Sequence, residues 1–98
     1  MNEVTVTQLA GLTDPTVVDV REPFEFASGH VPRATNIPLS ELPARHSELS
    51  ASDSVYVICQ SGGRSVQATQ YLEAVGHTAI NVTGGTAAWI SAQLTTDR

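Results

Sequence analysis

Short apolar runs alternate with amphipathic segments along the whole chain. The runs are rich in β-branched residues and bounded by turn residues, and they predict five strands, at residues 3–6, 16–20, 34–39, 54–58 and 78–82. Ala68, Tyr71, Leu72 and Val75 follow helical spacing, which predicts a helix over 65–75 that ends before Gly76.

Four further segments carry helix signals between or after the strands. Thr7 and Ser40 are expected to cap the first and third of these helices, and Pro23 lies near the start of the second. The third helix has Pro43 in its first turn, and Gly84-Gly85 leads into the last, which carries Trp89. Strand and helix therefore alternate five times. This order predicts one α/β domain over residues 1–98, with a five-stranded parallel sheet and helices on both faces.

The only cysteine, Cys59, comes directly after the predicted strand 54–58. Ligands of parallel α/β sheets bind beyond the carboxyl ends of the strands, so the topology places this thiol where chemistry is expected. Polar residues and two glycines follow it, and we expect them to leave Cys59 unburied. Amides turned inward around such a loop, together with a helix N-terminus, favour an anion.

The pKa of Cys59 is therefore expected to lie below the free-thiol value of about 8.5. Each hydrogen bond to a charged acceptor is worth about 1.5–3 kcal/mol. A helix N-terminus supplies only about 0.3–1 kcal/mol, so amides should matter more than the dipole. The charge of Arg64 adds little if that side chain faces solvent.

Composition narrows the possible functions. The chain is 41% hydrophobic and 15% charged, with a net charge of −5, which suits a globular protein and disfavours nucleic-acid and anionic-membrane partners. No basic, apolar leader begins the sequence, and no apolar run reaches the roughly 18 residues of a membrane helix, so a cytoplasmic location is expected. A single cysteine excludes an internal disulfide.

Three segments, in order, resemble the rhodanese-like single-domain sulfurtransferases. "CQSGGRS" at 59–65 resembles their active-site loop, "VVDVREPFEFASGHVPRATNIPL" at 17–39 their other signature, and "VTGGTAAW" at 82–89 their closing segment. Together they span nearly the whole chain.

The resemblance implies that Cys59 takes sulfane sulphur from a small anionic donor such as thiosulfate, holds it as a persulfide and passes it to cyanide, a thiol or a protein. It implies a persulfide cradle and a set of supporting residues, namely Gln60, Ser61, Gly62, Gly63, Arg64 and Ser65 for the cradle, and Asp19, Arg21 and His30 for support. No cofactor is expected. No metal is expected either, because the three histidines lack finger-like spacing with Cys59.

Several residues leave alternatives open. Arg33 stands where the family pattern has glycine, so it either adopts a positive φ at a cost of about 1 kcal/mol or adds charge at the substrate entrance. Asp19 is expected to pair with Arg21 or Arg33, because an unpaired buried carboxylate is costly. Ser61 and Ser65 either donate to the persulfide or cap the loop and helix.

The remaining side chains have simpler expectations. His30 is expected to be a hydrogen-bonded structural residue rather than a general base, His46 an exposed helix residue, and His77 part of the turn after Gly76. Trp89 is expected to pack in the core.

Three other functions compete with sulfur transfer. A phosphatase or arsenate reductase is the enzymatic alternative, although such relatives have a longer loop than the one from Cys59 to Arg64. A non-catalytic interaction module is the second, which retention of Cys59 and its glycines disfavours. A redox sensor is the third, because an exposed cysteine of low pKa oxidises readily.

Overall fold

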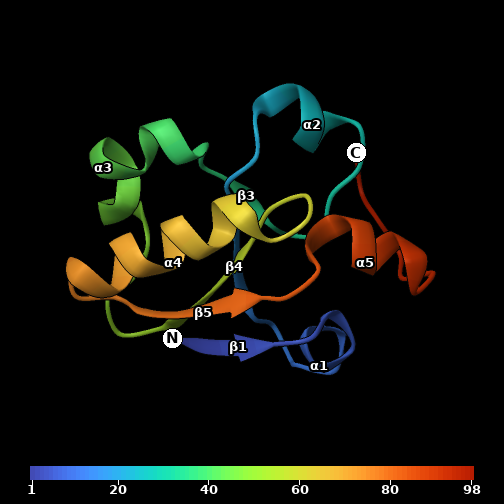
Figure 1. The fold of residues 1–98 in the computed structure, drawn as a ribbon, viewed down its shortest axis with the longest axis horizontal. Helices are drawn as coiled ribbons and strands as arrows, with labels where there is room; N and C mark the ends of the chain where they lie inside the picture. Colours follow the sequence, from blue (N-terminus) through green and yellow to red (C-terminus); the bar gives the residue numbers. More distant parts are fainter.

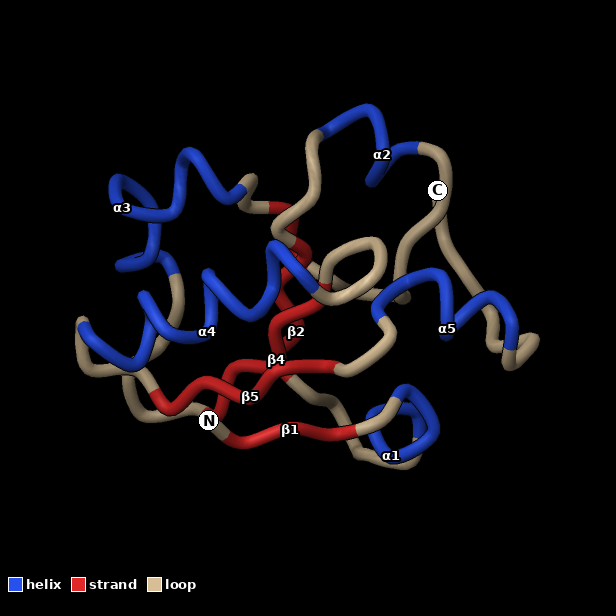
Figure 2. The backbone as a smooth tube through the Cα atoms, viewed as in Figure 1, coloured by secondary structure: helices blue, strands red, loops and turns tan.

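Five parallel strands form one sheet in the order β1–β5–β4–β2–β3 (Figures 1 and 2). The structure is a computed structural model that describes all residues from 1 to 98. The strands are β1 (Asn2–Val4), β2 (Thr16–Asp19), β3 (Thr35–Asn36), β4 (Ser54–Ile58) and β5 (Thr78–Val82). The predicted parallel sheet is confirmed, and β4 lies at its centre.

Helices cover both faces of the sheet, as predicted (Figure 1). They are α1 (Val6–Ala10), α2 (Pro23–Ala27), α3 (Leu42–Arg45), α4 (Gly63–Ala74) and α5 (Gly85–Ser91), with 3₁₀ turns at Leu39–Glu41 and His46–Glu48. Helices α3 and α4 pack on one face and α1 and α5 on the other, while α2 lies beyond the carboxyl ends of the strands. The longest helix has 12 residues, and none combines the length and apolar character needed to cross a bilayer.

The sheet separates two apolar clusters. Strand β4 shows why: side chains alternate between faces along a strand, so Val55 and Val57 pack with α4, whereas Tyr56 and Ile58 pack on the other side. Trp89 of α5 lies in the second cluster with 6% of its surface exposed, which confirms its predicted place in the core.

Four local predictions were wrong. The strand expected at 3–6 ends at Val4, because Thr5 caps α1 and Val6 begins that helix. Thr5, not Thr7, caps α1, because its hydroxyl accepts from the Gln8 amide while the Gln8 side chain accepts from the Thr5 amide. The helix expected over 40–49 breaks into a short α-helix between two 3₁₀ turns, since Pro43 cannot follow a helical turn without losing a hydrogen bond. Strand β3 ends at Asn36, short of the expected 34–39, although the amides of Ile37 and Leu39 still donate to the carbonyls of Asp19 and Val20.

Candidate active site

Cys59 ends the central strand, and its sulphur is enclosed by the loop that follows. The Gly62 amide donates to Sγ at 3.1 Å, and the Ser65 hydroxyl lies 3.4 Å from Sγ. Only 1% of Cys59 is exposed, so the expectation that the polar loop would leave it unburied was wrong. The loop folds back over the sulphur because Gly62 takes a φ of 121°, a conformation that other residues rarely adopt.

Competing effects set the pKa of the Cys59 thiol. Burial raises this pKa, but the Ser65 hydroxyl and the backbone amides of Ser65, Gly62 and Ser61 lower it by more. The pKa therefore lies below its ordinary value, as predicted from the loop. Amides and a hydroxyl, rather than a cation, are the groups that stabilise the thiolate.

Helix α5 holds the outer side of the loop. The amides of Thr86 and Ala87 donate to the carbonyls of Cys59 and Gln60, at 2.8 and 3.0 Å, and the Thr86 hydroxyl adds a bond to the Cys59 carbonyl at 3.1 Å. This approach requires Gly85: a Cβ there would lie 2.5 Å from the Cys59 carbonyl oxygen. No role was predicted for Thr86, although it lies within the closing segment "VTGGTAAW" at 82–89.

Arg21 links the first signature to the loop. It forms a buried pair with Asp19, with Nε and Nη2 at 3.0 and 2.9 Å from the two carboxylate oxygens. Its remaining N–H groups reach the Gly29 carbonyl at 2.8 Å and the Gln60 side-chain oxygen at 3.0 Å. The open choice of partner for Asp19 is thus settled in favour of Arg21, and the pair fixes the start of the loop.

Arg33 lies at the amino ends of the strands, whereas Cys59 lies beyond their carboxyl ends. Its φ is 68°, so the strained alternative holds. Its guanidinium pairs with Asp14 at 2.7 Å, and both side chains are largely exposed. These residues precede β3 and β2, whereas Cys59 follows β4, so Arg33 adds no charge at the substrate entrance.

Arg64 does not face solvent freely, because Glu25 of α2 binds it. Nη1 and Nη2 of Arg64 donate to Oε1 and Oε2 of Glu25, at 2.7 and 2.9 Å. The hydrogen bond from Arg64 is the main cause that lowers the pKa of Glu25 to about 2. Glu25 lies within the signature segment at 17–39, and nothing local in the sequence pairs it with a residue 39 positions away.

The histidines lie outside the thiol's surroundings. His30 stacks on Phe26 at 3.6 Å, with Nδ1 2.7 Å from the Phe26 carbonyl oxygen, in agreement with a structural role. His46 is partly buried, not exposed as expected, because its Nδ1 lies 3.2 Å from Nε2 of His77. His77 follows the turn at Gly76, as expected. No cluster of three or more potential metal ligands forms in the chain.

Comparison with known proteins agrees with this geometry. The rhodanese-like domain family matches residues 5–92, and the chain belongs to that family. It is 44% identical over 81 residues to protein YqhL of Bacillus subtilis (strain 168), covering 82% of this chain and 64% of that relative's length. It is 40% identical over 83 residues to a protein of Allochromatium vinosum named sulfurtransferase, covering 84% of this chain and 78% of that one.

A solved structure supports the same fold. The crystal structure of a rhodanese-related protein from Thermoplasma volcanium superposes with a TM-score of 0.94 at 33% identity, covering 99% of this chain and 98% of that one. The family and the five-stranded fold expected from the sequence are thus confirmed.

Proposed function

We propose that this domain is a sulfurtransferase that carries sulfane sulphur as a persulfide on Cys59. The observation that carries the proposal is the enclosed sulphur at the carboxyl end of β4, which accepts the Gly62 amide, faces the Ser65 hydroxyl and has a lowered pKa. A thiolate, and the anionic persulfide it becomes, suit such a cradle of preorganised donors. Gln60, Ser61, Gly63 and Arg64 complete the loop.

The reaction consists of two displacements at sulphur. With thiosulfate as donor, the Cys59 thiolate forms a bond to the outer sulphur, the donor's S–S bond breaks and sulfite leaves with the electron pair. An acceptor then attacks the terminal sulphur, and the Cys59 thiolate departs with the electrons of the S–S bond. Cyanide becomes thiocyanate, and a thiolate becomes a persulfide.

The acceptor belongs to another molecule. Cys59 is the only cysteine, so no second thiol of this chain can attack the persulfide. A thiol or a protein thiol is therefore the proposed acceptor. A cytoplasmic location accords with a free thiol, which a reducing compartment maintains.

Intact mass spectrometry after exposure to thiosulfate tests this function. The protein should gain one sulphur atom, lose it on treatment with a reductant, and form thiocyanate when cyanide is added. Cys59→Ser, with its fold checked by circular dichroism, should do none of these. Absence of any gain in the wild-type protein would favour the non-catalytic interaction module. Thiocyanate formation by folded Cys59→Ser at the wild-type rate would exclude Cys59 as the sulphur carrier.

A further inference from the structure

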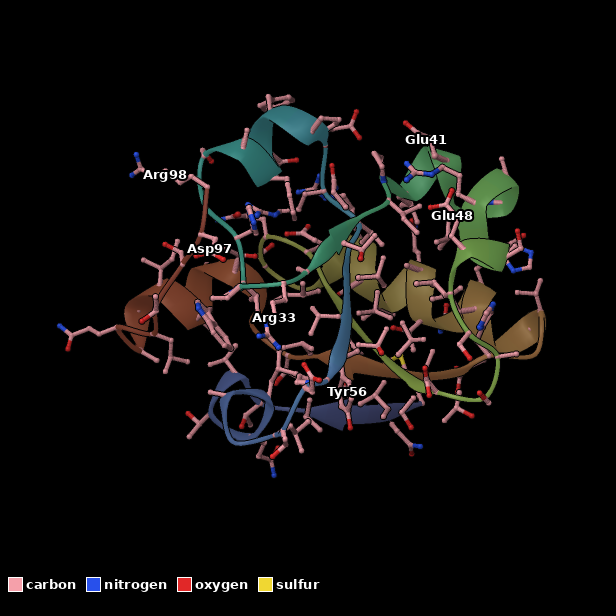
Figure 3. The ribbon with its side chains drawn as sticks, turned by 180° about the vertical axis from the view of Figure 1, so that it is seen from behind. Arg33, Glu41, Glu48, Tyr56, Asp97 and Arg98 are labelled. Carbon is pink, nitrogen blue, oxygen red and sulfur yellow. The ribbon has the colours of Figure 1, made fainter.

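The cations of this chain are nearly all bound to carboxylates. The five basic residues are all arginines. Four of them form ion pairs, namely Arg21 with Asp19, Arg33 with Asp14, Arg45 with Glu41 and Glu48, and Arg64 with Glu25. The fifth, Arg98, has no ion pair, and its side chain projects outward from the molecule (Figure 3). Only Arg21 and Arg64 contact or belong to the Cys59 loop, so both cations of the candidate site are already neutralised.

The pair of Arg64 with Glu25 is built to persist. Its two parallel N–H···O contacts are the strongest ion-pair arrangement that a guanidinium offers. With its pKa lowered to about 2 by Arg64, Glu25 stays ionised at any physiological pH. Glu25 Oε1 also accepts the Glu22 amide at 3.0 Å, which anchors the carboxylate at the start of α2.

Donors differ in the charge that they bring to this neutral surrounding. Thiosulfate is a dianion, so its attack by the Cys59 thiolate gathers three negative charges. A protonated organic hydropersulfide, R–S–SH, gathers only one. In that reaction the thiolate bonds to the outer sulphur, the donor's S–S bond breaks, and R–S⁻ leaves with the electron pair, while Cys59 retains the S–SH group. With Arg21 and Arg64 both held by carboxylates, the lower-charge reaction needs less compensation.

We propose that Glu25 is a positioning residue that sets donor specificity: by occupying the Arg64 guanidinium it disfavours dianionic donors and selects uncharged organic hydropersulfides. This proposal rests on the proposed sulfurtransferase function and names its substrate class. Thiosulfate remains a working but poor donor. Freeing Arg64 should improve thiosulfate far more than the hydropersulfide.

A pair of charge-matched variants provides the test. Glu25→Gln frees Arg64 and keeps an oxygen for the Glu22 amide. Asp14→Asn frees Arg33 and changes net charge by the same amount at the amino ends of the strands, so it controls for long-range attraction. The probes are thiosulfate and 2-hydroxyethyl hydropersulfide generated in the assay, and the readouts are KM and kcat for sulphur loading onto Cys59.

Glu25→Gln should raise kcat/KM for thiosulfate about tenfold, mainly through a lower KM. The value for the hydropersulfide should change less than about twofold, and added salt should reduce the thiosulfate gain. Asp14→Asn should keep the wild-type donor ratio. Glu25→Asp retains the carboxylate, so it should keep most of the wild-type preference.

The decisive quantity is the ratio of kcat/KM for thiosulfate to kcat/KM for the hydropersulfide. If this ratio is the same in folded Glu25→Gln and Asp14→Asn, the role of Glu25 is overturned and the sulfurtransferase function stands. A wild-type protein that gains no sulphur from either donor would overturn both. The wild-type protein offers a check that needs no variant: its kcat/KM for thiosulfate should not fall as salt is added, since both arginines at the loop are held by carboxylates. A steep fall would contradict the proposal.

Discussion

Replacing Ser65 by alanine should raise the pKa of the Cys59 thiol by about one unit. Ser65 is fully buried, and its Oγ lies 3.4 Å from the Cys59 sulphur and 3.1 Å from the Gly62 carbonyl oxygen. A hydroxyl has one hydrogen. While Cys59 is protonated, its S–H donates to Oγ and the hydroxyl donates to the Gly62 carbonyl. When Cys59 ionises, the hydroxyl hydrogen is free to turn toward the sulphur.

The size of the effect follows from this exchange of partners. A hydrogen bond to a charged acceptor is worth about 1.5–3 kcal/mol, and the neutral bond to the Gly62 carbonyl that is given up is worth about 0.5–1.5 kcal/mol. The net gain on ionisation is about 1–1.5 kcal/mol, and about 1.36 kcal/mol corresponds to one pKa unit. The Gly62 amide remains in the variant, so part of the depression of the pKa should survive.

The pH dependence of Cys59 alkylation by iodoacetamide measures this pKa directly, because the chain has no other thiol. Ser61→Ala is the control, since its exposed side chain is lost while its backbone amide stays. A midpoint in folded Ser65→Ala equal to or below that of the wild type would refute the role of the hydroxyl.

The same pKa also links the thiol to stability. The pKa of the thiol is lower in the folded protein than its unfolded value of about 8.5. Ionisation of Cys59 therefore stabilises the fold, and this contribution is complete at pH values above the unfolded pKa. This contribution is lost as pH falls through the folded pKa. Ser65→Ala should therefore shrink the rise in unfolding free energy with pH, which denaturant titrations at several pH values would show.

Three further predictions concern the groups that hold the loop. Gly85→Ala should lower thiocyanate formation on the order of 10²-fold in a folded protein, because its Cβ would meet the Cys59 carbonyl oxygen and displace the loop; wild-type activity would contradict this contact. Arg21→Ala should destabilise the domain by about 3–5 kcal/mol in denaturant unfolding, because Asp19 would stay buried without its partner; a loss below about 1 kcal/mol would show that the pair is dispensable. The native protein should not hydrolyse para-nitrophenyl phosphate, since the six-residue loop gives a narrower ring of donors than the longer loop of phosphatase-like relatives; phosphate release that Cys59→Ser abolishes and that outpaces sulphur loading would reverse the order of the two enzyme functions.

The sheet and the position of the thiol could be predicted because both depend on local patterns. Strand β4 is a short apolar run bounded by turn residues, and α4 carries a helical stripe that ends at Gly76. Regular alternation of such elements leaves few topologies. Once the sheet is parallel, a residue that directly follows β4 must lie at its carboxyl edge, which is where Cys59 lies.

The contacts that shape the site could not be predicted in the same way. Gln60 meets Arg21, and Arg64 meets Glu25, each across 39 positions of sequence, and only the packed fold brings them together. Burial of Cys59 was missed because the polarity of a loop indicates solvent on average, whereas here the backbone turns its amides inward around the sulphur.

Burial of the Cys59 sulphur bears on which atom of the proposed persulfide an acceptor can attack. Attack on the inner sulphur would release hydrosulfide and leave a mixed disulfide on Cys59, which would stop turnover. Attack on the outer sulphur transfers that atom and restores the thiolate. The inner sulphur keeps only 1% exposure for the whole residue, with the Gly62 amide and Ser65 hydroxyl against it. The outer sulphur extends about 2 Å further along the S–S bond, so it is the atom nearer to an incoming acceptor. Enclosure of Cys59 therefore favours transfer of the outer sulphur to the acceptor over release of hydrosulfide. The same enclosure slows the entry of any reagent that must reach the thiol itself.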